Sequence, residues 1–110
     1  MELVLLTTFG VITGPAVEEL IFRGYVLTML QQHMMSAVSA TLWASLIFTS
    51  IHFAFGVGVV VFAFFSSLLL SALFLVSNSL YPAILMHSLI NFWGFVAWPI
   101  LSHAGSRNST

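Results

Sequence analysis

Long apolar runs with almost no charge dominate this sequence of 110 residues. Hydrophobic residues make up 60% of the chain and charged residues only 5%, whereas a soluble domain carries roughly 25% charged residues. So few charged side chains could not cover a surface that faces water, and the composition therefore predicts a lipid bilayer as the solvent. We expect an integral, multi-pass membrane protein with room for about four spanning helices of about 20 residues each.

Polar and turn-forming residues divide the chain into an opening segment and three further apolar runs. The opening segment, residues 3–13, ends at Gly14-Pro15, and at about 1.5 Å per residue it is too short to cross about 30 Å of hydrocarbon. Proline breaks a preceding helix and suits the first turn of a new one, so we predict a Pro-kinked opening segment and then a helix over residues 16–32. The further runs cover residues 34–55, 59–76 and 81–101. The sequence thus predicts an all-α, multi-spanning transmembrane helical bundle of about four helices.

Helix signals also stand between and after these runs. Residues 77–79, Ser-Asn-Ser, are typical of a turn and of a helix N-cap, and Pro82 follows where a first helical turn tolerates proline. Trp98 and Pro99 are expected to mark the exit of the last run, and residues 102–110 form a polar tail.

The composition also excludes several kinds of chemistry and partner. The chain contains no cysteine, which excludes disulfides, a thiol nucleophile and thiolate metal sites. The formal net charge of −1 provides no basic patch, so we expect no nucleic-acid partner.

Three of the five charged residues lie close together on one expected helix, at Glu18, Glu19 and Arg23. An ionisable group inside a membrane span costs at least a few kcal/mol, and by default it indicates a function. Positions i and i+4 of a helix are neighbours, so Glu19 and Arg23 can form an ion pair. Glu18 is turned by about 100° from Glu19 and stays free to act as a base. The alternative is a structural ion cluster at a helix end near the membrane surface.

Histidine and asparagine supply polar groups in two of the other runs. His52 lies within the second run, whereas His87 and Asn91 are four residues apart in the last run and share one helix face. The third run, residues 59–76, has no ionisable residue, and we expect it to contribute no polar group at membrane depth. Each group alone has an ordinary explanation: a histidine bonded to a carbonyl or to water, and a polar pair that joins helices.

Taken together, these polar groups predict one internal cavity on which three helices converge. A carboxylate can deprotonate water, a histidine can position the water or pass protons, and His and Asn donors can stabilise an oxyanion. The inventory favours hydrolysis. A transporter or proton relay is the alternative, because chains of Glu and His also carry ions in membranes.

Three short motifs follow one another along the apolar runs. Residues 18–23 fit the pattern EExxxR, residues 48–52 fit FxxxH and residues 87–91 fit HxxxN. Each motif alone is loose, but all three in this order on separate runs are specific. The chain resembles the CPBP family of CAAX proteases and bacteriocin-processing enzymes, also called Abi, which includes the type II CAAX prenyl endopeptidases. The resemblance covers most of the chain and implies an endopeptidase that acts inside the membrane.

The resemblance also implies a role for each motif residue. Glu18 would be the general base, helped by His52 in activating water, and His87 and Asn91 would hold the oxyanion. The implied site therefore has four catalytic residues and three supporting residues: Glu18, His52, His87 and Asn91, supported by Glu19, Arg23 and Phe48.

The same resemblance sets expectations for domain, location and partners. Residues 1–110 would form a single transmembrane catalytic core, truncated at its N-terminus because fuller members of the family carry more spanning helices. We expect a bacterial-type plasma membrane, with membrane lipid and a membrane-associated peptide or a lipidated protein, such as a prenylated CAAX tail, as partners. A non-catalytic binding or immunity module on the same scaffold is a further interpretation.

A zinc-dependent form of the same reaction is also open, since the family is commonly labelled metalloprotease. His52, His87 and Glu18 could supply three ligands to zinc, with water as the fourth. The chain lacks HExxH, in which two histidines of one helix flank a catalytic glutamate. Using Glu18 as a ligand would also remove the best candidate for the base. We therefore favour metal-free activation of water by glutamate.

Overall fold

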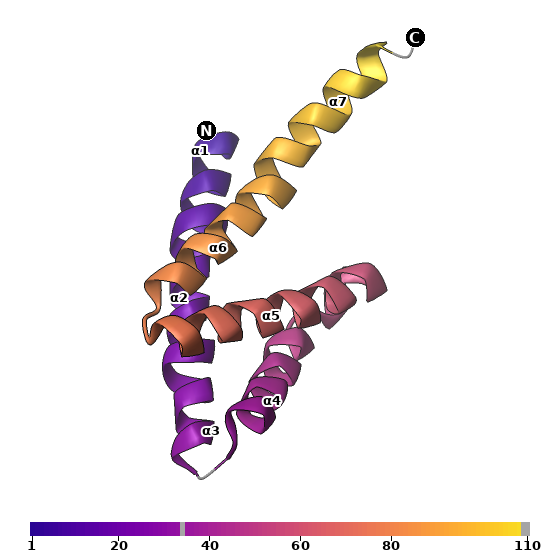
Figure 1. Cartoon of the computed structure of the whole chain (residues 1–110). Coiled ribbons are helices and arrows are strands. Elements are labelled where there is room, and N and C mark those ends of the chain that lie inside the picture. The colour runs from indigo at the N-terminus through magenta and orange to yellow at the C-terminus, as the bar shows by residue number, and fades with distance from the viewer. Residues whose placement is uncertain (34, 109–110) are drawn as a thin grey trace.

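The computed structural model describes residues 1–33 and 35–108, and these residues form helices and short connections without a strand. Figure 1 shows one long helix at the N-terminal end, a hairpin of α4 and α5, and a second long helix that carries the C-terminus. The predicted all-α membrane fold is confirmed. Residue 34, where the second run is predicted to begin, and residues 109–110 of the predicted tail lie outside the described residues.

Within the described residues, three helices are long and apolar enough to cross a membrane: Glu2–Gln32, Val57–Ser77 and Tyr81–Arg107. The fourth helix, α4 (Ala37–Ser50), has only 14 residues. α6 packs against the first long helix and against α5, which in turn packs against α4. Many large apolar side chains face outward, as expected for a chain whose solvent is lipid.

The first long helix contradicts the prediction of a break at Pro15. It runs through α1 (Glu2–Leu5), η1 (Leu6–Thr13), α2 (Gly14–Glu19), η2 (Leu20–Leu27) and α3 (Thr28–Gln32) without interruption (Figure 1). The reason is that η1 is π-helical: the Gly14 N–H donates to Phe9 O, five residues back. This wider winding before the proline relieves the clash that a proline ring causes in an α-helix.

The second long helix also continues past its predicted end. α6 (Tyr81–Phe92) passes through the π-helical stretch η4 (Trp93–Ala97) into α7 (Trp98–Asn108), so the predicted exit at Pro99 is not a helix end. The Trp98 N–H donates to Trp93 O, which repeats the arrangement before Pro15. Residues 102–108 of the predicted polar tail are therefore helical.

The turn predicted before α6 is confirmed. α5 (Val57–Ser77) ends at Asn78, which has the left-handed φ of 52°. The Tyr81 N–H donates to Ser79 Oγ at 3.2 Å, which satisfies a donor at the start of α6. Pro82 lies in the first turn of α6, where its missing N–H costs nothing.

His52 lies outside the helix that was predicted to contain it. The second run does not form one span, because α4 ends at Ser50 and a short 3₁₀ helix, η3 (Phe53–Phe55), follows. The His52 N–H donates to Thr49 O at 2.9 Å, which closes the last turn. His52 is therefore held at the exit of α4 and not in the middle of a helix.

Replacing Gly14 by alanine should destabilise the fold. An added Cβ would lie 2.5 Å from Phe9 O, so the π-helical turn would have to shift, at a cost of about 1–3 kcal/mol. Gly58→Ala is the matched control, because nothing lies within 4 Å of a Cβ at that helical position. Thermal unfolding in detergent should give a lower midpoint for Gly14→Ala and no loss for Gly58→Ala. Equal midpoints for the two variants would contradict this account of the first helix.

Candidate active site

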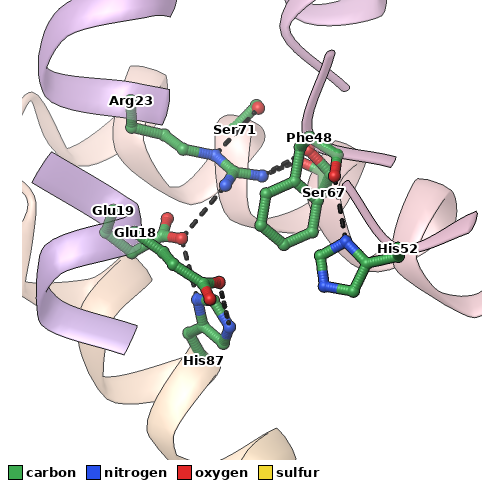
Figure 2. Close-up of polar contacts among 8 residues, drawn as sticks. All are labelled: Glu18, Glu19, Arg23, Phe48, His52, Ser67, Ser71 and His87. Carbon is green, nitrogen blue, oxygen red and sulfur yellow. Dashed lines mark hydrogen bonds and ion pairs between the residues drawn. The ribbon is translucent and has the colours of Figure 1, made fainter. Parts of the chain in front are cut away.

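Arg23 is the centre of a buried polar cluster that joins the first long helix to α5 (Figure 2). Its side chain is 0% exposed and forms the predicted ion pair with Glu19, with Nη1 at 3.0 Å from Oε2. Nη2 donates to Ser67 O at 2.8 Å and also to Ser67 Oγ, and Nε donates to Ser71 Oγ at 3.3 Å. The guanidinium therefore has partners on three nitrogens, as a buried charge requires.

Glu19 and Glu18 hold the two ring nitrogens of His87. The Nδ1–H of His87 donates to Glu19 Oε2 at 2.8 Å, and Nε2 lies 3.4 Å from Glu18 Oε2. The second distance is slightly longer than an ordinary hydrogen bond. The three residues form one carboxylate–imidazole–carboxylate chain that links the first long helix to α6 (Figure 2).

Glu18 and Glu19 differ sharply in their access to solvent. The side chain of Glu18 is 34% exposed, whereas that of Glu19 is 0% exposed. This agrees with the sequence argument that pairs Glu19 with Arg23 and turns Glu18 away. Among the described residues, Glu19 Oε1 has no hydrogen-bond partner although it is buried, while its Oε2 accepts from both Arg23 and His87.

Phe48 touches both halves of the site (Figure 2). Arg23 Cζ lies 5.0 Å from the centre of its ring, at the distance of a cation–π contact. The ring centre of Phe48 is 5.9 Å from that of His87 and 4.8 Å from that of His52. Phe48 therefore lies between the charged cluster and His52.

The backbone of Phe48 also orients His52. A carbonyl oxygen only accepts, so the 2.9 Å contact between His52 Nδ1 and Phe48 O places the proton on Nδ1. When His52 is neutral, its Nε2 then carries a lone pair. The FxxxH spacing is thus explained: a residue four positions before the histidine supplies the carbonyl that fixes its tautomer.

Asn91 lies on the same face of α6 as His87, as predicted, but its side chain forms a hydrogen bond to a different helix. Its Nδ2 donates to Gly10 O in η1 at 2.9 Å. The side chain is partly exposed, and it lies on the wall of a cavity that His87 also lines.

A cavity of about 250 Å³ brings together three of the four predicted catalytic residues. Glu18 is not part of its wall and reaches it through His87, 3.4 Å away. The wall is mostly apolar, with four polar residues and with apolar residues from α4, α5, α6 and η4. The polar residues are His52, Ser66, His87 and Asn91, and the others are Phe48, Val59, Phe62, Ala63, Leu70, Ile90, Gly94 and Phe95.

The predicted zinc ligands do not fit a metal in this arrangement. Across residues 1–33 and 35–108, no three His, Asp or Glu side chains are grouped as metal ligands, and His52, His87 and Glu18 are no exception. Nδ1 of His87 already donates to Glu19 Oε2 at 2.8 Å, and Nε2 lies 3.4 Å from Glu18 Oε2.

Ser67 and Ser71 are the site residues that the motifs miss. The third run was expected to contribute no polar group at membrane depth, and this is wrong, because both serines are 0% exposed and bind Arg23. Their spacing is the signal that could have found them. Serines four residues apart lie on one helix face, and small hydroxyl residues often join membrane helices.

Removing both serine hydroxyls should destabilise the fold. In the Ser67→Ala/Ser71→Ala variant, the buried guanidinium keeps Glu19 and one carbonyl but loses two acceptors, at a cost of about 1.5–3 kcal/mol for bonds to a charged group. Ser66→Ala, on the cavity side of the same helix, is the control. Thermal unfolding in detergent should give a lower midpoint for the double variant than for Ser66→Ala. A double variant as stable as Ser66→Ala would contradict the role given to α5.

Comparison with known protein families agrees with the motifs. Residues 1–93 match the family described as type II CAAX prenyl endopeptidase Rce1-like. Comparison with curated proteins and with solved structures gave no match. The matched residues include all three motifs and most of the chain, so the family predicted from those motifs is confirmed. The chain belongs to the type II CAAX prenyl endopeptidase Rce1-like family.

Proposed function

We propose that the chain is an intramembrane endopeptidase that hydrolyses a peptide bond of a membrane-associated substrate, with Glu18 as the general base. The family match supports the reaction class, and three candidate spans support the membrane setting. One observation carries the choice of base. Glu18 is 34% exposed, whereas Glu19 and Arg23 are 0% exposed.

The difference in exposure between Glu18 and Glu19 indicates different roles for the two carboxylates. Glu19 is held by Arg23 and by His87 and is fully buried. Glu18 is partly exposed, and a carboxylate that meets water can take its proton. The hydroxide oxygen then bonds to the carbonyl carbon of the substrate. When the C–N bond breaks, the amine leaves with a proton and the new chain end is a carboxylate.

His87 is suited to move that proton. Its Nδ1–H bond to Glu19 orients the ring and fixes its tautomer, as a carboxylate does for other catalytic histidines. A proton accepted by Glu18 can move across the 3.4 Å gap to Nε2 after a small shift. The imidazolium can then donate to the oxyanion or to the departing amine.

The cavity is the proposed place of the scissile carbonyl. His52 offers the Nε2 lone pair as an acceptor for the attacking water, because Nδ1 keeps its proton for Phe48 O. Asn91 uses one N–H for Gly10 O and keeps the other as an oxyanion donor. The apolar walls limit water, which strengthens each of these interactions.

The substrate that best fits is a lipidated protein or a membrane-associated peptide. The family description names a CAAX prenyl endopeptidase, and the apolar walls suit a substrate delivered from lipid. The cavity volume of about 250 Å³ is below the range of roughly 300–1,000 Å³ for a whole small ligand. It therefore holds the cleaved bond and its nearest side chains.

A proton relay fits the geometry less well. A relay needs a path of polar groups from one side of the membrane to the other. Along the described residues, the chain from Glu18 through His87 and Glu19 ends at Arg23 and its serine partners, which are 0% exposed. Among the described residues, this series of polar groups is therefore exposed only at its Glu18 end.

Glu18→Gln should abolish proteolysis and leave the fold intact. Glutamine keeps the size and can still bond His87, but it cannot take a proton, so turnover should fall by about 10²- to 10⁴-fold. The purified protein in lipid vesicles should be assayed with a prenylated CAAX peptide and with unlipidated membrane peptides.

Glu2→Gln is the matched control, since Glu2 is an exposed carboxylate at the start of the same long helix. It should cleave at the wild-type rate. Full activity of a folded Glu18→Gln protein would remove Glu18 as the base. Proton flux that depends on Glu18 without cleavage would favour the relay, and biological activity that survives Glu18→Gln with His52→Ala would favour a binding module.

Chelation should leave the activity unchanged. The proposed reaction uses Glu18 and its histidine partner, and within the described residues no three His, Asp or Glu side chains are grouped as metal ligands. The active enzyme should be dialysed against a chelator, then assayed with and without added zinc. Loss of activity that zinc restores would refute the metal-free form of the reaction and support its zinc-dependent form.

A further inference from the structure

The amide of Asn91 is oriented by a carbonyl that belongs to another helix. Nδ2 donates to Gly10 O at 2.9 Å across 81 positions of sequence. An amide nitrogen has two N–H bonds. Because one is fixed on Gly10, the plane of the amide is set and the second N–H is left for another acceptor. The proposed oxyanion donor thus depends on an available carbonyl in η1.

A carbonyl inside a helix is normally occupied by the helix itself. In an α-helix Gly10 O would accept from Gly14 N–H, but this N–H donates to Phe9 O instead. In the π-helical pattern of η1, Gly10 O would accept from the N–H five residues later. That residue is Pro15, which has no N–H. Gly10 O is consequently left open, and Asn91 takes it.

The two helices also come close enough for this bond at a glycine. A Cβ added to Gly10 would lie 3.4 Å from Cδ2 of Phe95, which follows Asn91 on the same long helix. Pro15 itself is less than 2% exposed. The open carbonyl of Gly10 therefore lies where the two long helices contact each other.

We infer that Pro15 is a positioning residue for Asn91: by withholding an N–H it leaves Gly10 O free to orient the amide that donates to the substrate. This inference rests on the proposed function for its catalytic consequence, but the bond from Asn91 to Gly10 stands apart from any activity. Pro15→Ala restores an N–H five residues after Gly10, and this N–H would share the carbonyl with Asn91 and change the geometry of its bond.

The first test measures the Asn91 side-chain amide signal directly, by solid-state NMR of protein labelled with ¹⁵N-asparagine in lipid vesicles. The chain has three asparagines, Asn78, Asn91 and Asn108, so Asn91→Ala identifies the signal. Pro15→Ala should shift the Asn91 side-chain signal. Pro82→Ala, in the first turn of α6, should not. An unmoved Asn91 signal in a folded Pro15→Ala protein would overturn the inference.

A second variant separates the missing N–H from the shape of the ring. Placing lactic acid, the hydroxy analogue of alanine, at position 15 gives the backbone of alanine without an N–H. It should keep the wild-type Asn91 signal. If Pro15→Ala does not fold, folding of the lactic acid protein supports the inference. If neither protein folds, the inference is overturned, because position 15 would then require the proline ring itself.

The kinetic test is a double-mutant cycle on the peptidase. Loss of an oxyanion donor lowers kcat by about 10²- to 10³-fold, so Asn91→Ala should fall in that range and Pro15→Ala by about tenfold, with KM nearly unchanged. In the Asn91→Ala background, Pro15→Ala should lower kcat no further. Independent, multiplicative losses would overturn the positioning role. A wild-type protein without peptidase activity would refute the proposed function, and the NMR result would still decide the Asn91 bond.

Discussion

The buried guanidinium of Arg23 is the interaction on which the rest of the structure depends. A charge at membrane depth costs at least a few kcal/mol unless it is paired and hydrogen-bonded. Glu19 supplies the opposite charge from the same helix, Ser67 and Ser71 supply acceptors from α5, and Phe48 of α4 covers the cation. Arg23 thereby holds the first long helix, α4 and α5 in one arrangement. The hydrogen bond between Glu19 and His87 and the ring contacts of Phe48 depend on this arrangement of helices.

The proposed transfer of a proton between Glu18 and His87 would leave the charge balance of the cluster unchanged. Arg23 and Glu19 cancel each other, so Glu18 and His87 remain. Whether the next proton lies on the carboxylate or on the imidazole, the four groups together are neutral, and neither position leaves an unpaired charge in a medium of low dielectric. The proposed transfer between Glu18 and His87 therefore creates no net charge. The partial exposure of Glu18 leaves this pair accessible from outside the helix bundle.

Much of the site could be predicted from spacing, because residues four apart on a helix share a face. That rule gives the Glu19–Arg23 pair and places His87 beside Asn91. It does not give the contacts between helices, so the serines of α5 and the bond from Asn91 to Gly10 were missed. The predicted helix break at Pro15 was wrong because local rules for proline assume α-helical winding, whereas η1 is π-helical. The all-α membrane fold, by contrast, follows from the composition and from the lengths of the apolar runs.

The most direct test of the central claim is a comparison of protein termini by mass spectrometry in native cells that carry the full gene with Glu18 or with Glu18→Gln. If Glu18 activates water for proteolysis, the wild-type cells should contain new C-termini from membrane-associated proteins, and these should vanish in the variant at equal expression. Cleaved sequences would also reveal the substrate. Identical sets of termini in the two strains would contradict the claim that this cluster hydrolyses peptide bonds.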